Sequence, residues 1–297
     1  MSTPSAAKPT AAIVSTAIVG LRTAPFRQRV DARWLMAYAA GVGDRSPCYL
    51  DTLCAESIVG HPLFVVGPEW PVILAVRDAQ LAAGATMDVI RRGVHASHDV
   101  TVHRLVRPGD ELTTTATVVG IEHRSPGAYL TMELETVDAA GAKVATTQQG
   151  TIYLGSATDG PDVLPPQTLP PLQHIEPATD ALVDIVDISA IEAHTYTECA
   201  RIWNPIHTDV AVAMDAGLPG LILHGTATLA KAVSIAVARH ANGDPARVAR
   251  VACRFAATVA MPERLTVRTE LHGNVVSIAV ETSQGQQALR TCSVTLR

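Results

Sequence analysis

Residues 201–209 read Arg-Ile-Trp-Asn-Pro-Ile-His-Thr-Asp, and a long apolar run opens with His224-Gly225. An earlier stretch, Asp44-Arg45-Ser46-Pro47-Cys48-Tyr49-Leu50-Asp51, aligns with the eight residues from Ile202 to Asp209 at an offset of 158 positions. The same offset carries Gly67 onto Gly225 without a gap. Because two separate motifs recur at one offset, the sequence indicates a duplicated domain.

Both halves of the chain repeat one order of predicted elements, with helices first and alternating, β-branched strands after them. A short strand is expected at 18–21. The first half then predicts a helix that begins after Asp31, an apolar helix at 71–83, and strands at 97–104, 111–122, 128–138 and 143–153. The second half predicts a strand at 181–187, helices at 189–197 and 224–240, and strands at 246–255, 264–271, 275–282 and 287–296.

This order is typical of an α+β protein. Each copy has one long apolar helix that a single curved antiparallel sheet can wrap. Pairing the two sheets edge to edge would bury edges that are otherwise exposed. We therefore predict two tandem modules, at 16–155 and 180–297, joined by a linker at 156–179 that holds six of the 19 prolines.

Composition narrows the class of protein. The chain has 297 residues, 47% of them hydrophobic and 17% charged, with a formal net charge of −5. These values predict a soluble globular protein that has no basic surplus for nucleic acid or an anionic membrane. Five cysteines without CxxC spacing argue against a disulfide framework and favour the cytoplasm. No apolar stretch has the length of a membrane span.

Metal binding is not expected either. His95, His98 and His103 are closely spaced, but no carboxylate or cysteine set accompanies them at the spacing of a metal site. Neither a metal nor another cofactor is predicted.

The most specific signal is Asn204-Pro205-Ile206-His207-x-Asp209 together with His224-Gly225. It resembles the MaoC-like hydratase/dehydratase family, which includes R-specific enoyl-CoA hydratases, in a two-module arrangement called the double hotdog. The family turn reads approximately Gly-Asp-x-Asn-Pro-aliphatic-His-x-Asp, and its first Asp and its His form the catalytic pair. The resemblance implies an acyl-thioester substrate on coenzyme A (CoA) or a carrier protein. It also implies a catalytic C-terminal module and a degenerate N-terminal module that shapes the acyl pocket.

The resemblance and the required chemistry assign roles to particular residues. Hydration of a 2-enoyl thioester needs a base for water, an acid for C2 and donors for the thioester oxygen. His207 is the expected base, Asn204 orients the water, and the Gly225 N–H donates to the thioester oxygen. The residues expected to bind or enclose the substrate are His224, Asp44, Tyr49, Phe64 and Gly67.

The chain departs from the family pattern at the acid. Ile202 occupies the position of the catalytic Asp, and Arg201 that of the preceding Gly. The first copy keeps Asp44 but has Ser46 in place of the Asn and Tyr49 in place of the His. Three alternatives follow. Glu198 or Asp209 supplies a carboxylate, Asp44 reaches across the module interface, or His207 acts alone with water. We favour His207 as the sole essential general base, with a helper carboxylate that the sequence does not identify.

The leading hypothesis is a hydratase or dehydratase of a 2-enoyl or 3-hydroxyacyl thioester. The alternative is a non-catalytic acyl-thioester-binding module, or a partner subunit of a heteromeric hydratase. Thioester hydrolysis is disfavoured because the C-terminal turn lacks the carboxylate that it needs. A homodimer or a hetero-oligomer is expected.

Overall fold

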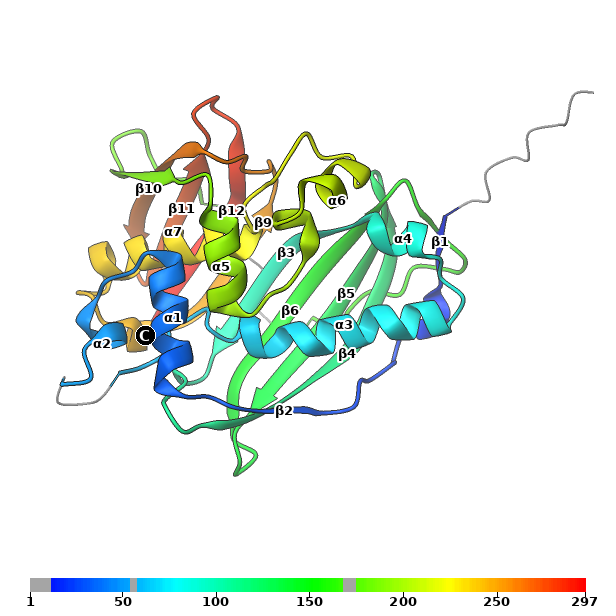
Figure 1. Cartoon of the computed structure of the whole chain (residues 1–297), viewed down its shortest axis with the longest axis horizontal. Helices are drawn as coiled ribbons and strands as arrows, with labels where there is room; N and C mark the ends of the chain where they lie inside the picture. Colours follow the sequence, from blue (N-terminus) through cyan, green and yellow to red (C-terminus); the bar gives the residue numbers. More distant parts are fainter. Residues whose placement is uncertain (1–11, 54–57, 168–174) are drawn as a thin grey trace, which may run out of the picture.

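The computed structural model describes residues 12–53, 58–167 and 175–297. Its main feature is a continuous ten-stranded sheet with the helices gathered on one face (Figure 1). The strand order is β2-β4-β5-β6-β3-β9-β12-β11-β10-β8, and every pairing in this sheet is antiparallel. The first five strands come from one half of the chain and the last five from the other.

The two halves contain matching elements. The first half has β2 (Phe26–Arg29), α1 (Ala32–Val42), α2 (Pro47–Leu50), α3 (Val66–Ala82), α4 (Met87–Arg91), β3 (Gly93–Val102), β4 (Glu111–Arg124), β5 (Gly127–Val137) and β6 (Lys143–Leu154). The second half has β8 (Leu182–Ile188), α5 (Glu192–Ala200), a 3₁₀ helix (Pro205–His207), α6 (Val210–Asp215), α7 (Gly225–His240), β9 (Val248–Phe255), β10 (Glu263–His272), β11 (Val275–Glu281) and β12 (Gln287–Leu296).

Each half-sheet curves around one long apolar helix. α7 packs against β9, β10, β11 and β12, and α3 packs against β2 and β4. Both helices are apolar on most sides, as expected for helices enclosed by a sheet. The predicted α+β class and the wrapped-helix modules are confirmed.

β3 and β9 join the two half-sheets at their edges. Five residue pairs are in register between them, among them Ser97 with Arg254 and His98 with Cys253. This pairing covers the strand edge that each half would expose alone, as the sequence predicted.

A second contact between the halves lies between α1 and α5, and it shows the repeat directly. Tyr38 and Tyr196, 158 positions apart, pack edge to face with ring centroids at 6.0 Å. Gly41 and Cys199 are also 158 positions apart, and a Cβ on Gly41 would lie 2.6 Å from the Cys199 Cβ. Equivalent residues therefore meet across an approximate twofold axis.

Several expected elements differ from the structure: α5 and β3 are shifted by a few residues, and two elements differ more. The strand expected at 18–21 is wrong, because Thr16–Ile18 form a 3₁₀ helix capped by the Ser15 hydroxyl. α3 begins at Val66 rather than at Pro71. Pro68 lies in the first turn, where backbone N–H groups lack helical partners, and Pro71 removes only one further hydrogen bond.

The segment expected to be a linker falls partly outside the described residues, at 168–174. Its first part is held against the N-terminal half. β7 (Ala157–Thr158) pairs in parallel with β1 (Ile13–Val14), and Val163 forms a bridge with Ile121. In the described part of the chain no helix is long and apolar enough to cross a membrane.

We predict that Gly41→Ala destabilises the protein through the α1–α5 contact. The new methyl group would overlap Cys199, so the free energy of unfolding should fall by roughly 1–3 kcal/mol, although Ala favours a helix by about 1 kcal/mol. Gly220→Ala is the matched control, because a Cβ there meets nothing within 4 Å. Urea unfolding measures both variants, and adding Cys199→Gly should recover part of the loss. Wild-type stability of Gly41→Ala would contradict the tight contact.

The free energy of unfolding should also depend on pH, because several imidazoles are buried in their neutral form. Burial lowers the pKa of His61, His98 and His207 to about 4 and that of His95 to about 3. An unfolded His takes up its proton near pH 6.5, so the stabilisation is complete above that pH. This stabilisation is lost as the pH falls from about 6.5 to about 4. For each imidazole the loss is up to about 1.4 kcal/mol per pH unit.

His98→Leu tests this dependence, because neither ring nitrogen of His98 has a hydrogen-bond partner among the described residues. The variant should be at least as stable as the wild type at pH 7, and its stability should fall less steeply between pH 6.5 and 4.5. His123→Leu, at an exposed position, should keep the wild-type slope. Urea unfolding at several pH values in this range measures the slope of stability against pH. An unchanged slope in His98→Leu would show that His98 does not contribute to the pH dependence.

Candidate active site at the start of helix α7

The turn that carries His207 is shaped by its backbone. α5 ends at Ala200, and Arg201 follows in the left-handed conformation with φ of 59°. Gly43 has φ of 86° at the equivalent end of α1, 158 positions earlier. Asn204 is extended, and Pro205 then begins the 3₁₀ helix that ends at His207. The repeat has thus kept the turn geometry while replacing a Gly by an Arg, whose guanidinium lies 4.0 Å above the Trp34 ring.

His207 is a buried, neutral imidazole of defined tautomer. Its Nδ1 lies 2.9 Å from the Ile222 carbonyl oxygen. A carbonyl only accepts hydrogen bonds, so Nδ1 carries the proton and Nε2 keeps a lone pair. Burial lowers the pKa of His207 to about 4, against a smaller opposite effect of the Ile222 backbone. Nε2, which forms no hydrogen bond with any described residue, is available as a base.

His224 holds the His207 ring in place. The two rings stack with centroids 3.7 Å apart and an angle of 25° between their planes. His224 Nε2 lies 3.1 Å from the Thr197 hydroxyl. Burial and the neighbouring His207 lower the pKa of His224 well below its usual value, which keeps this imidazole neutral as well.

Gly225 opens α7 directly beside this stack. Its N–H is in the first helical turn, and neither it nor the Thr226 N–H has a hydrogen-bond partner among the described residues. The helix dipole places partial positive charge there. A Cβ on residue 225 would lie 2.8 Å from the Phe255 ring, so only a glycine allows that ring to approach the helix start.

None of the neighbouring carboxylates considered from the sequence joins His207. Ile202 occupies the expected Asp position, is 6% exposed and packs in the hydrophobic core. Glu198 is exposed and accepts a hydrogen bond from the Trp203 indole. Asp209 caps α6 by accepting from the backbone N–H groups of Ala211 and Val212.

Asp44 lies in the equivalent turn of the first copy, far along α7 from Gly225. It accepts hydrogen bonds from the backbone N–H and the hydroxyl of Ser46, at 2.9 and 2.6 Å. Burial raises the pKa of Asp44, but hydrogen bonds from Ser46 and Ser234 outweigh this effect and lower it overall. Ser234 is nine residues after Gly225, about 13 Å along the helix axis. Asp44 and His207 therefore belong to separate polar groups.

The other predicted substrate-binding residues are enclosed in the fold. Tyr49 is 1% exposed, and its hydroxyl has no hydrogen-bond partner among the described residues. Phe64 is fully buried against Trp34 and Tyr38. Gly67 lies at the start of α3, where a Cβ would approach the Ala200 carbonyl oxygen to 2.6 Å. Asn204 is half-buried in the turn itself.

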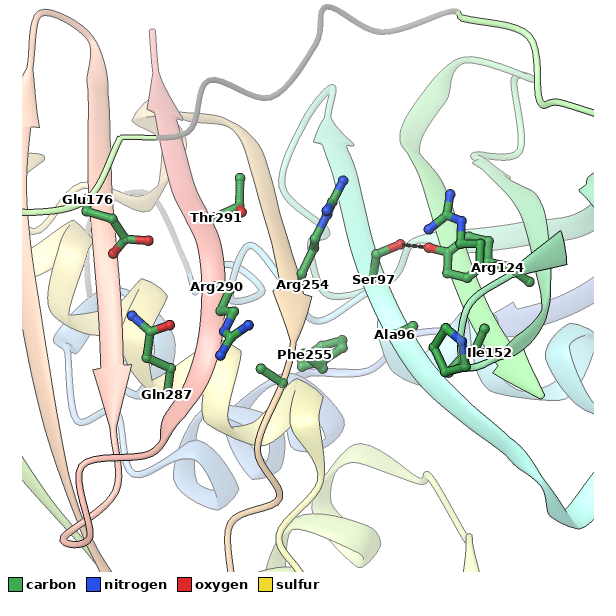
Figure 2. Close-up of a pocket in the computed structure, with 13 residues that line it drawn as sticks. Ala96, Ser97, Arg124, Ile152, Glu176, Arg254, Phe255, Gln287, Arg290 and Thr291 are labelled. Atoms are coloured by element: carbon green, nitrogen blue, oxygen red, sulfur yellow. Dashed lines mark hydrogen bonds between the residues drawn. The ribbon is translucent and has the colours of Figure 1, made fainter. Parts of the chain in front are cut away.

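One region was not foreseen from the sequence. A cavity of about 670 Å³ opens on the face of the sheet away from α7, and residues of β3, β4, β5, β6, β9 and β12 line it (Figure 2). Phe255 is one of its walls and also touches Gly225. Arg254 and Arg290, which also line it, are Cα partners on β9 and β12, but their side chains point in opposite directions (Figure 2). In the sequence they are isolated charges in two strand patterns 36 positions apart, which gives no signal that the two strands pair there.

The closely spaced histidines do not form a metal centre. His95 and His98 contact each other edge to face at 5.5 Å, and His103 lies beside the Thr146 hydroxyl. Within residues 12–53, 58–167 and 175–297 there is no group of three or more His, Cys, Asp or Glu side chains suited to a metal ion.

Comparison with known protein families gives two matches that together span most of the chain. Residues 179–291 match the MaoC-like domain, and residues 17–147 match the dehydratase domain region of the FAS1-like family. The two matches cover the two halves described above.

Individual relatives agree with these matches. The chain is 28% identical over 182 residues to peroxisomal multifunctional enzyme type 2 of Drosophila melanogaster, covering 58% of this chain and 29% of that one. It is 22% identical over 186 residues to peroxisomal enoyl-CoA hydratase 2 of Arabidopsis thaliana, covering 61% and 60%. The chain thus aligns with less than two thirds of either relative's length.

Solved structures confirm the double hotdog fold. A MaoC-like dehydratase from Phytophthora capsici superposes with a TM-score of 0.75 at 20% identity, over 92% of this chain and 95% of that one. The two family matches identify residues 179–291 as a MaoC-like domain and residues 17–147 as a FAS1-like dehydratase region, and the likeness to solved structures shows the double hotdog fold that both halves form.

Proposed function

We propose that the chain hydrates a 2-enoyl thioester, or dehydrates the corresponding 3-hydroxyacyl thioester, at the start of α7. The observation that carries this proposal is the neutral His207, whose ring stacks on His224. His224 immediately precedes the first N–H groups of α7, which have no hydrogen-bond partner among the described residues. A base next to oxyanion donors is what addition of water to an enoyl thioester requires. The name of the Arabidopsis relative, an enoyl-CoA hydratase, is consistent with this reaction.

In the proposed reaction the thioester oxygen accepts a hydrogen bond from the Gly225 N–H. His207 Nε2 takes a proton from water, whose oxygen attacks C3, and the electron pair of the double bond moves toward the thioester oxygen. The imidazolium of His207 then returns the proton to C2. This sequence conserves protons without a second acid, so it needs no carboxylate at position 202. Asn204 is proposed to orient the attacking water.

A second candidate function follows from Ile202. This side chain is buried in the core where the family has its catalytic Asp. The site at the start of α7 could therefore bind an acyl thioester without turning it over and serve a partner subunit that has the complete pair.

The edge strand β8 carries exposed apolar side chains: Leu182, Val183 and Ile185 are about half exposed. This exposed edge favours either a homodimer or a hetero-oligomer. A cytoplasmic location is part of this proposal, supported by five cysteines in the sequence without CxxC spacing.

The first test removes the base. His207→Ala should lower kcat/KM for 2-enoyl-CoA hydration by about 10²–10⁴-fold, the usual contribution of general acid–base catalysis. Loss of the enoyl absorbance reports hydration, and a thiol reagent reports hydrolysis. His103→Ala, which removes an exposed imidazole, is the control. Turnover that survives His207→Ala would exclude the mechanism, binding without turnover would support the second function, and thiol release would indicate a thioesterase.

The second test restores the family acid. Ile202→Asp should raise kcat if the turn still places position 202 for catalysis, and it should lower stability by roughly 1–3 kcal/mol because a polar group replaces a core side chain. Ile202→Asn has similar size and burial without an acid, so it should lose stability without gaining activity. Steady-state kinetics and thermal unfolding of the three proteins separate the two effects. Equal rates in both variants would show that the turn has lost the family geometry.

A further inference from the structure

Helix α3 carries a half-buried guanidinium without a counter-ion. Arg77 lies in the second half of α3, and burial lowers the pKa of its guanidinium. The guanidinium lies 5.1 Å from the centre of the Trp70 ring, and it forms neither a hydrogen bond nor an ion pair with a described residue. Arginine stays charged in proteins. A partly desolvated charge of this kind costs stability unless an anion pairs with it.

The two carboxyl groups on α3 do not neutralise Arg77. The Glu69 carboxyl accepts a hydrogen bond of 2.5 Å from the Thr147 hydroxyl, and burial raises the pKa of Glu69 to about 8. Glu69 is therefore mostly protonated at neutral pH and carries little charge. Asp78 follows Arg77 directly in the chain, but its side chain is exposed to solvent and forms no ion pair with a described residue. The anion that Arg77 requires must come from outside the described chain.

Arg77 lies over the start of β3. Gln80, about one turn later on α3, accepts a hydrogen bond of 2.8 Å from the Tyr153 hydroxyl of β6. Tyr153 pairs with Gly93, the first residue of β3, and His95 follows two residues later. Burial is the largest cause of the low pKa of His95, and the Arg77 charge also contributes. Figure 1 shows α3 crossing the strands of the N-terminal half on the face of the sheet that carries the helices.

A line of contacts leads from this end of β3 to the candidate active site. The His95 ring lies 4.6 Å from the Phe255 ring, and Phe255 lies against Gly225 at the start of α7. His95 and Phe255 belong to the neighbouring strands β3 and β9. Because neighbouring strands are about 4.8 Å apart, Arg77 and the start of α7 are separated by roughly 5–10 Å across the sheet. A short acyl chain whose thioester oxygen is bound at Gly225 can span such a distance.

We propose that Arg77 binds a carboxylate at the far end of the acyl group, so that the substrate is a short dicarboxylic enoyl thioester. This inference rests on the proposed function for the thioester at Gly225. A guanidinium presents its N–H donors in a planar fork that matches a carboxylate. The Trp70 indole N–H, which has no hydrogen-bond partner among the described residues, is a further donor beside it. The carboxylate would offset the unpaired charge on α3 and fix which end of the acyl group points away from His207.

Calorimetry with the full chain and saturated CoA thioesters tests the site without turnover. Adipoyl-CoA and hexanoyl-CoA form one pair that differs only in the terminal carboxylate, and succinyl-CoA and butyryl-CoA form a shorter pair. In the wild type the carboxylated member of at least one pair should bind about 10-fold more tightly or better, the usual contribution of a hydrogen bond to a charged group. Arg77→Gln should abolish this preference, and Arg77→Lys, which keeps the charge, should retain part of it. Arg33→Gln, at an exposed position on α1, should bind like the wild type.

The paired ligands separate recognition of the acyl carboxylate from other roles of Arg77. If Arg77→Gln weakens binding of both members of a pair equally, Arg77 serves the CoA portion that they share, and the proposal is overturned. Equal affinities of the wild type for both members, or binding of neither, would also overturn it. Without ligand, Arg77→Gln should be at least as stable to heat as the wild type, because the substitution removes a partly buried charge. A lost preference in a folded variant therefore reports the carboxylate contact.

Kinetics separate this proposal from the proposed function. The ratio of kcat/KM for 2-hexenedioyl-CoA to that for 2-hexenoyl-CoA should fall about 10-fold or more in Arg77→Gln, for the same loss of a charge-assisted hydrogen bond. If a dicarboxylic thioester binds through Arg77 but no enoyl thioester is hydrated, the hydratase proposal fails and the carboxylate site stands. If the wild type hydrates 2-hexenoyl-CoA and shows no preference for a dicarboxylic thioester, the hydratase proposal stands and the carboxylate site is overturned.

Discussion

The antiparallel pairing of β3 with β9 is the contact on which the rest of the molecule depends. It converts two open five-stranded sheets into one ten-stranded sheet and brings α1 of one copy against α5 of the other. Tyr38 and Tyr196 meet at that contact because they are equivalent residues on either side of the twofold axis. The start of α7 then lies beside the end of β9, next to β3 of the other copy. A single module would leave this region open to water.

The two copies have become chemically different within the same backbone. The C-terminal turn keeps an imidazole whose Nε2 forms no hydrogen bond with a described residue, and this ring stacks on a second neutral imidazole at a helix start. The N-terminal turn keeps its carboxylate, but Asp44 is satisfied by Ser46 and Ser234, and Tyr49 replaces the imidazole. Because Asp44 belongs to a separate polar group, the losses in the two turns do not compensate for each other. This separation is why the proposed mechanism relies on one base and the helix N-terminus.

Much of the fold could be predicted from the sequence, because the 158-residue repeat and the alternating strands are local signals. The start of α3 was misplaced because Pro71 resembles a first helical residue, whereas Pro68 and Pro71 both lie inside the helix. For the site, the turn and Gly225 were identifiable from spacing. The His207–His224 stack and the Phe255 contact were not, because they depend on how distant segments pack. The pairing of Arg254 with Arg290 likewise depends on strand register, which the sequence pattern does not reveal.

The central claim is that the thioester carbonyl binds at the Gly225 N–H while His207 Nε2 faces C3. A crystal structure of the chain with a saturated acyl-CoA, which cannot be hydrated or dehydrated, tests this most directly. The account predicts the thioester oxygen within hydrogen-bond distance of the Gly225 nitrogen and the acyl C3 facing His207. A thioester bound at the Asp44 turn, or remote from the start of α7, would contradict it.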